Sequence, residues 1–231
     1  MAKQSKPRPE RLDLDQFESV EDALEKIESG DRYFDIGKLA MSYGEDGAGL
    51  PLTRPVLFWF SMITRSQGLH DAIVREVGEG NPHAVFPLIR AFAESVVLVY
   101  YVLDHPDYVE ALMDHPRNFG KHGPRRKSMQ SLITYMEKDA PGMKDVYANL
   151  SEATHFGSTA MWASAKPGES GEHDFTWASA PEWRSDEQAL IACAQTLEMA
   201  DAMTFLLTRF AERYVVSQLQ VTNPVRHEPG D

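Results

Sequence analysis

The chain has 231 residues, of which 42% are hydrophobic and 25% charged, and this composition is typical of a globular protein with a sizeable core. Its formal net charge of -12 repels phosphate and anionic lipid, so we expect no membrane binding and no general binding to DNA. The single cysteine, Cys193, cannot form an internal disulfide, and the charged N-terminal sequence lacks the apolar region of a secretory signal, which together favour a cytoplasmic protein.

Apolar residues recur at helical spacing through most of the chain, in segments bounded by capping residues, prolines and glycines. The segment over residues 82–103 is apolar almost all round, which is typical of a helix at the centre of its domain. It contains Arg90 and Glu94, which would be costly in lipid, so we interpret it as a core helix rather than a membrane span. The full set of predicted helices covers residues 20–29, 53–77, 82–103, 128–138, 143–156 and 185–218, with a shorter helix between the Asp-His-Pro sequences at 104–106 and 114–116.

A different pattern precedes the last predicted helix. The sequence Trp-Ala-Ser-Ala begins at Trp162 and again at Trp177, on either side of a Pro- and Gly-containing stretch, which favours a β-hairpin. We therefore predict an all-α helical bundle of about five to seven helices, with a small β-hairpin inserted before the long C-terminal helix. In this prediction residues 16–221 form a single helical domain with the hairpin at about 159–180, residues 1–15 form a flexible arm, and residues 222–231 form a flexible tail.

Two charged residues stand out on the apolar helix. Arg90 and Glu94 are four residues apart, so their side chains can meet on one helix face. Burying a charge is costly unless it is paired and hydrogen-bonded, so we expect further polar groups from another helix to reach this pair. Such a cluster is either an internal structural clamp or part of a binding site, and the sequence leaves both open.

The segment over residues 143–156 offers suitable partners. Tyr147, Ser151 and His155 follow at steps of four and so place a phenol, a hydroxyl and an imidazole on one helix face. The alternative is a core or capping histidine near the end of the helix. A serine hydrolase is not indicated, because the chain has no Gly-x-Ser-x-Gly sequence.

A basic loop links the middle helices. The stretch Arg117–Lys127 concentrates cationic side chains in an acidic protein, and such a patch could hold phosphate through Lys121, Arg125, Arg126 and Lys127. It could equally be a solvated connection. The histidines are scattered and no His-Glu-x-x-His occurs, so we expect neither a metal site nor a cofactor.

The sequences Leu88-Ile-Arg-Ala-Phe-Ala-Glu94 and Tyr147-Ala-Asn-Leu-Ser-Glu-Ala-Thr-His155 carry a resemblance to an uncharacterised bacterial all-helical family that pairs an Arg-x3-Glu helix with a later Tyr-x3-Ser-x3-His helix. That family is similar to the HEPN group (higher eukaryote and prokaryote nucleotide-binding), and the likeness covers about residues 53–215. It implies a helical bundle, often dimeric, with relatives among the nucleases of bacterial defence and toxin systems.

The nuclease members carry Arg-x4–6-His, often with Asn, Asp or His directly after the arginine. Arg117, followed by Asn118, has this spacing to His122, and so does Arg65 to His70, although without the favoured second residue. The Arg117 match lies in a Gly- and Pro-containing loop, whereas a rigid helical site would be expected, and this departure puts nuclease activity in doubt.

Three hypotheses follow. The first is a helical bundle of bacterial defence or stress in which Arg90, Glu94, Tyr147, Ser151 and His155 form a structural lock or a site for a small polar ligand. The second is an RNA-acting nuclease with Arg117 and His122 as catalytic residues. The third is an interaction protein that forms a homodimer through the hairpin and the long last helix.

Overall fold

The computed structural model describes residues 12–29, 52–113, 126–155, 165–167, 175–177 and 179–215. The described part of the chain is an all-α bundle, as the sequence predicted, and the last helix continues into one π-helical turn, η2. Its helices are α1 (Val20–Glu28), α3 (Arg54–Gly78), α4 (Pro82–Asp104), α5 (Tyr108–Met113), α6 (Met129–Met136), α7 (Met143–Thr154), α9 (Asp186–Phe210) and η2 (Ala211–Val215).

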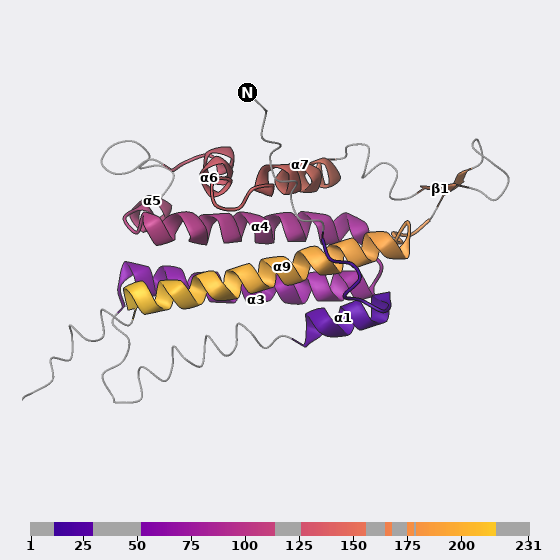
Figure 1. Ribbon diagram of the computed structural model, residues 1–231, viewed down its shortest axis with the longest axis horizontal. Coiled ribbons are helices and arrows are strands. Elements are labelled where there is room, and N and C mark those ends of the chain that lie inside the picture. Colours follow the sequence, from indigo (N-terminus) through magenta and orange to yellow (C-terminus); the bar gives the residue numbers. More distant parts are fainter. Residues whose placement is uncertain are drawn as a thin grey trace, which may run out of the picture.

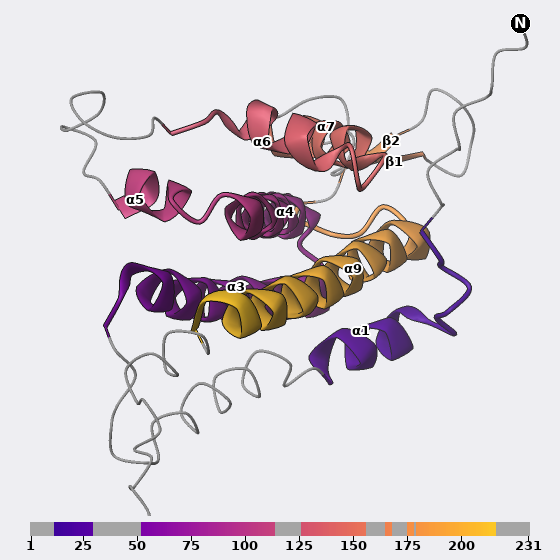
Figure 2. The same ribbon diagram turned by 60° about the vertical axis from the view of Figure 1, so that its left-hand side comes forward.

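Helix α4 lies between two helical layers. It packs on one side against α3 and α9 and on the other against α7 and α6 (Figure 1). Figure 2 shows the same order from another side, with α6 and α7 above α4 and with α1 beneath the α3–α9 layer. Because both sides of α4 are covered, its sequence must be apolar around most of its circumference. This arrangement confirms the prediction that the segment over 82–103 is central.

Polar side chains cap the start of several helices. Ser19 accepts a hydrogen bond from the Asp22 backbone N–H, and Ser185 accepts one from that of Gln188. Asn81 does the same for Ala84, directly before Pro82 at the first helical position. Each bond satisfies one of the backbone donors that a helix leaves unpaired at its start.

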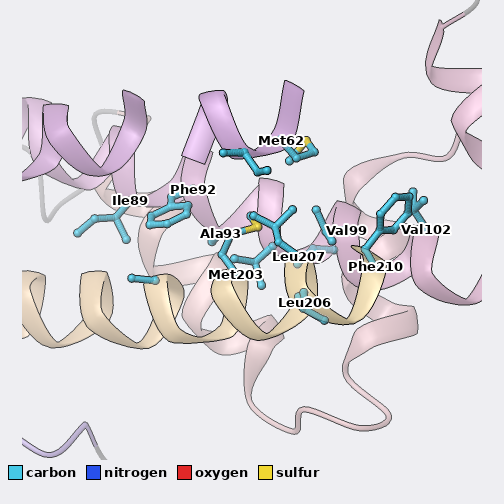
Figure 3. Close-up of a cluster of buried hydrophobic side chains, with 14 of the residues drawn as sticks. Met62, Ile89, Phe92, Ala93, Val99, Val102, Met203, Leu206, Leu207 and Phe210 are labelled. Carbon is cyan, nitrogen blue, oxygen red and sulfur yellow. The ribbon is translucent and has the colours of Figure 1, made fainter. Parts of the chain in front are cut away.

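The core forms where α3, α4 and α9 meet. Figure 3 shows Met203, Leu207 and Phe210 of α9 packed among side chains from α4 and α3. The indole Nε1 of Trp59, fully buried on α3, donates a hydrogen bond of 3.0 Å to the carbonyl of Leu207 and so joins the two helices by a polar contact within the core. On the last helix, residues at steps of four and three form one buried stripe: Ala189, Cys193, Thr196, Ala200, Met203, Leu207 and Phe210.

Some details differ from the sequence prediction. The α-helix expected to reach residue 218 ends at Phe210, where the backbone changes to η2, and the residues after 215 lie outside the described ones. Leu12 and Leu14, inside the predicted arm, pack against the core. Ala165–Pro167 (β1) and Phe175–Trp177 (β2) pair antiparallel with Ala165 opposite Trp177, but most of the predicted hairpin lies outside the described residues, so the hairpin as a whole stays a prediction.

Two helices have the length and hydropathy of membrane spans. They are α4 and the continuous helix formed by α9 and η2, and about half of each apolar window is buried inside the protein, 56% and 44% respectively. A core helix of a globular protein has the same properties, so this resemblance to membrane spans is weak evidence of a membrane location.

The thiol of Cys193 is expected to resist alkylation until the protein unfolds. The side chain is fully buried, and burial raises the pKa of the thiol to about 11. In the unfolded chain the pKa of a cysteine thiol is about 8.5. Between about pH 8.5 and 11 the native state therefore holds the thiol proton more tightly than the unfolded state does, so the free energy of unfolding falls as the pH rises through this range. Iodoacetamide labelling at pH 8, with and without urea, measures this difference. Equal labelling rates would show that the thiol is accessible in the native state.

Candidate functional site

The partly buried side chain of Arg90 connects α4 to α7. Its Nη2 donates a hydrogen bond of 2.9 Å to the hydroxyl of Tyr147, and its Nη1 lies 2.7 Å from Nε2 of His155. The Tyr147 hydroxyl in turn donates to Glu94 Oε1 over 2.7 Å. Arg90, Glu94, Tyr147 and His155, which we call the polar cluster, are therefore brought together as the sequence predicted.

The charges of the polar cluster are largely compensated within it. Arg90 Nε lies 3.3 Å from Glu94 Oε1, which is an ion-pair distance, although this buried Nε–H does not meet the geometry of a hydrogen bond with any described residue. The guanidinium also lies over the Tyr147 ring, with 5.0 Å between its central carbon and the ring centroid. An aromatic face attracts a cation, so this contact adds to the ion pair.

Tyr147 is the neutral bridge between the two charges. Partial burial and the hydrogen bond to the Glu94 carboxylate raise the pKa of the Tyr147 hydroxyl, while Arg90 acts in the opposite direction. A phenol that keeps its proton can both donate to Glu94 and accept from Arg90. A carboxylate at position 147 could accept from Arg90 but could not donate to Glu94, whereas the tyrosine hydroxyl does both.

His155 closes the cluster at the solvent-exposed edge. The residue is the C-cap of α7 and its side chain is exposed, whereas the Arg90 side chain is only 19% exposed. An arginine can only donate hydrogen bonds, so the short contact requires His155 Nε2 to be the acceptor, with the ring proton on Nδ1. The imidazole therefore accepts a hydrogen bond from Arg90 Nη1, and a dissolved hydrogen-bond acceptor could reach the same N–H.

Ser151 has a different role from the one its spacing predicted. Its hydroxyl donates a hydrogen bond of 2.7 Å to the carbonyl of Tyr147, one turn earlier in the same helix. Such a bond to the preceding turn is a common alternative for serine within a helix. The Ser151 hydroxyl therefore bonds to the α7 backbone, and within the described residues it makes no hydrogen bond with a side chain of the polar cluster.

The predicted phosphate loop is described only at its end. Arg126 donates to the carbonyls of Ala111 and Leu112 at the end of α5 over 3.0 and 2.5 Å. Lys127 Nζ lies 5.6 Å from the centroid of the Tyr101 ring. Both side chains thus contact the protein itself. The remaining predicted residues, Arg117, Lys121, His122 and Arg125, lie outside the described residues, and the nuclease hypothesis stays a prediction.

The second Arg-x4-His match lies within α3. Arg65 is exposed and its Nε donates to Ser95 Oγ on α4 over 3.0 Å, whereas His70 is buried. Five residues along an α-helix correspond to a rotation of about 140° between the two side chains. The two side chains therefore face different environments and do not form a shared solvent-exposed site.

Tyrosines and carboxylates also gather at the end of α4, where sequence reasoning predicted no site. Tyr135 donates to Asp104 over 2.9 Å, and Tyr100 bonds Asp139. The bond to Asp139, followed by burial, raises the pKa of Tyr100 to about 12. A short spacing pattern could not reveal this arrangement, because its residues come from α4 and from α6 with the turn that follows it, which are distant in the sequence.

Within the described ranges, no group of three or more histidine, cysteine, aspartate or glutamate side chains is placed to hold a metal ion. Comparison of the chain with family models, with curated proteins and with solved structures finds no match. The function must therefore be argued from the polar cluster itself.

Proposed function

We propose that this protein is a helical-bundle binding protein in which the polar cluster locks α7 onto α4 and binds a small polar ligand at its exposed edge. The observation that supports the lock is the Arg90 side chain, which contacts His155, Tyr147 and Glu94 from two helices. The ligand would carry a hydrogen-bond acceptor such as a carboxylate or phosphate oxygen.

The exposure of the cluster supports a binding role in addition to the lock. The Glu94 side chain is 31% exposed and His155 lies at the surface, so the cluster opens toward solvent on one side. A guanidinium has five N–H donors in a planar fork, and the described hydrogen bonds use two of them. An incoming oxygen can replace His155 Nε2 as acceptor, and the imidazole can then turn to donate to the same ligand.

Thermal unfolding in the presence of named probes tests the proposal. Inorganic phosphate, acetate, citrate and adenosine monophosphate are added in turn, and at least one is expected to raise the Tm of the wild-type protein. A ligand at 100 times its Kd stabilises the native state by about 2.7 kcal/mol, which corresponds to several degrees. His155→Ala is expected to change this rise, because it removes both the acceptor that competes for Arg90 Nη1 and the imidazole that could donate to the ligand.

His105→Ala is the matched control, because His105 is also an exposed helix C-cap but lies at the end of α4. It should leave the ligand-induced rise in Tm unchanged. If no probe stabilises the wild-type protein, or if His155→Ala responds as the wild type does, the binding role fails and the cluster acts only as a lock.

A further inference from the structure

The C-terminal half of α9 carries an exposed aromatic residue between opposite charges. The Phe205 side chain is 64% exposed, although it belongs to a helix whose opposite face forms the core. Asp201 and Arg209 lie four residues before and after it and are also exposed. Because steps of four follow one face of an α-helix, these three residues form a stripe that we call the Phe205 stripe.

The order of charges along the Phe205 stripe is self-complementary. Consider two copies of α9 that cross antiparallel at Phe205. A residue a given number of positions before Phe205 in one copy then lies opposite the residue the same number of positions after Phe205 in the second copy. Asp201 then lies opposite Arg209 of the second copy, and Arg209 lies opposite its Asp201. We propose that this face binds a second copy of the same chain in a two-fold symmetric homodimer centred on Phe205.

A groove beside Phe205 provides the apolar part of this interface. It has a volume of about 490 Å³ and lies between the ends of α4 and α9. Its apolar wall includes Tyr100, Leu103 and Leu206, and its rim carries residues of both charges. An aromatic side chain from the second copy, placed near the symmetry axis, would cover this wall and lose its own exposure to water. A central aromatic anchor within a polar rim is the usual anatomy of a protein interface.

Repulsion between charges farther from the centre does not outweigh the attraction between Asp201 and Arg209 of the two copies. Glu198 and Glu212 are each seven residues from Phe205, so the antiparallel arrangement brings like charges toward each other. Packed helices cross at an angle, and at about 10 Å from the crossing point they have diverged by several ångströms. Glu212 also lies 3.6 Å from Arg209 of its own chain, which partly compensates its charge. Asp201 and Arg209 lie only one turn from the centre, where the helices are closest.

Among the described helices, α1 does not extend to this half of α9. In both views α1 lies beside the N-terminal half of α9, away from the stretch that carries Phe205 (Figures 1 and 2). The interface thus uses the long last helix, and it does not depend on the polar cluster or on the ligand proposed for it.

Charge-reversal variants test the interface by sedimentation equilibrium of the full chain. Asp201→Arg places Arg opposite Arg209 at both symmetric positions, and Arg209→Asp places Asp opposite Asp201. Each variant alone is expected to dimerise at least tenfold more weakly than the wild type. A 1:1 mixture of the two restores both opposite-charge pairs and is expected to form heterodimers with nearly wild-type affinity.

Three results would overturn the proposal: a wild-type chain that is monomeric at all concentrations, a dimer that neither variant weakens, or a mixture that does not associate. The first would leave the groove available to a small molecule, and the second would place the interface elsewhere. Arg54→Asp is the control, because Arg54 is also an exposed arginine in an ion pair, with Glu110, but lies on α3. It should leave dimerisation unchanged.

Discussion

Replacement of Arg90 by methionine is expected to lower the free energy of unfolding by about 2–3 kcal/mol in urea denaturation. The substitution keeps most of the apolar stem but leaves Glu94 without its cation and Tyr147 without a donor. Removing one partner of a buried ion pair costs about 3–5 kcal/mol. The value expected here is smaller because the Glu94 side chain is 31% exposed and water can solvate it.

Arg54→Met provides a matched control for this measurement. Arg54 and Glu110 approach to 2.6 Å, closer than Arg90 Nε and Glu94 Oε1, but both side chains are more than half exposed. A surface ion pair contributes about 0–1 kcal/mol, so this variant should change stability little. If the two arginine variants have equal effects, burial does not strengthen the polar cluster and its role as a lock is wrong.

Glu94→Gln and Tyr147→Phe complete the analysis of the lock. Glu94→Gln removes the negative charge that pairs with Arg90, and Tyr147→Phe removes the hydroxyl that bridges Arg90 and Glu94. Each keeps the shape of the side chain and leaves a charged or polar group without its partner, at a cost of about 1–3 kcal/mol. Because the three side chains contact one another, the effects of combined substitutions should be clearly smaller than their sum. Additive effects would show that the three act independently.

The polar cluster was predictable because the sequence places two charged residues on an otherwise apolar helix. An ion pair among apolar residues on one helix requires partners from elsewhere, and Tyr147 and His155 were recognisable as candidates from their spacing of eight residues. The spacing could not exclude Ser151, because a hydroxyl at this position can bond either across helices or to its own backbone. Only the packing of α7 on α4 decides between these two choices.

The limits of prediction are clearest on α3. Steps of four and three place one stripe on this helix: Val56, Phe60, Ile63, Gln67, His70, Val74 and Val77. Four members of the stripe are buried, but Phe60, Gln67 and Val74 are not, whereas Trp59, Ser66 and Ile73 outside it are fully buried. One stripe at helical spacing assumes one packing partner, whereas α3 contacts both α4 and α9 and so buries a broader face. In the same way, the exposure of Phe205 cannot be read from its apolar character, because it depends on which neighbours cover α9.

Truncation of Leu207 to alanine is expected to have the largest effect on stability, about 2–5 kcal/mol in urea denaturation. Its side chain is fully buried between α9 and the helices α3 and α4, so the deletion leaves a cavity in the core and loses apolar burial. Leu52→Ala makes the same chemical change at a side chain that is 82% exposed and should cost less than about 0.5 kcal/mol. The truncation keeps the Leu207 carbonyl that accepts from Trp59, so the loss reports packing rather than the hydrogen bond. Similar losses at the two leucines would contradict the placement of α9 in the core, and with it the assignment of Phe205 to the outer face of that helix.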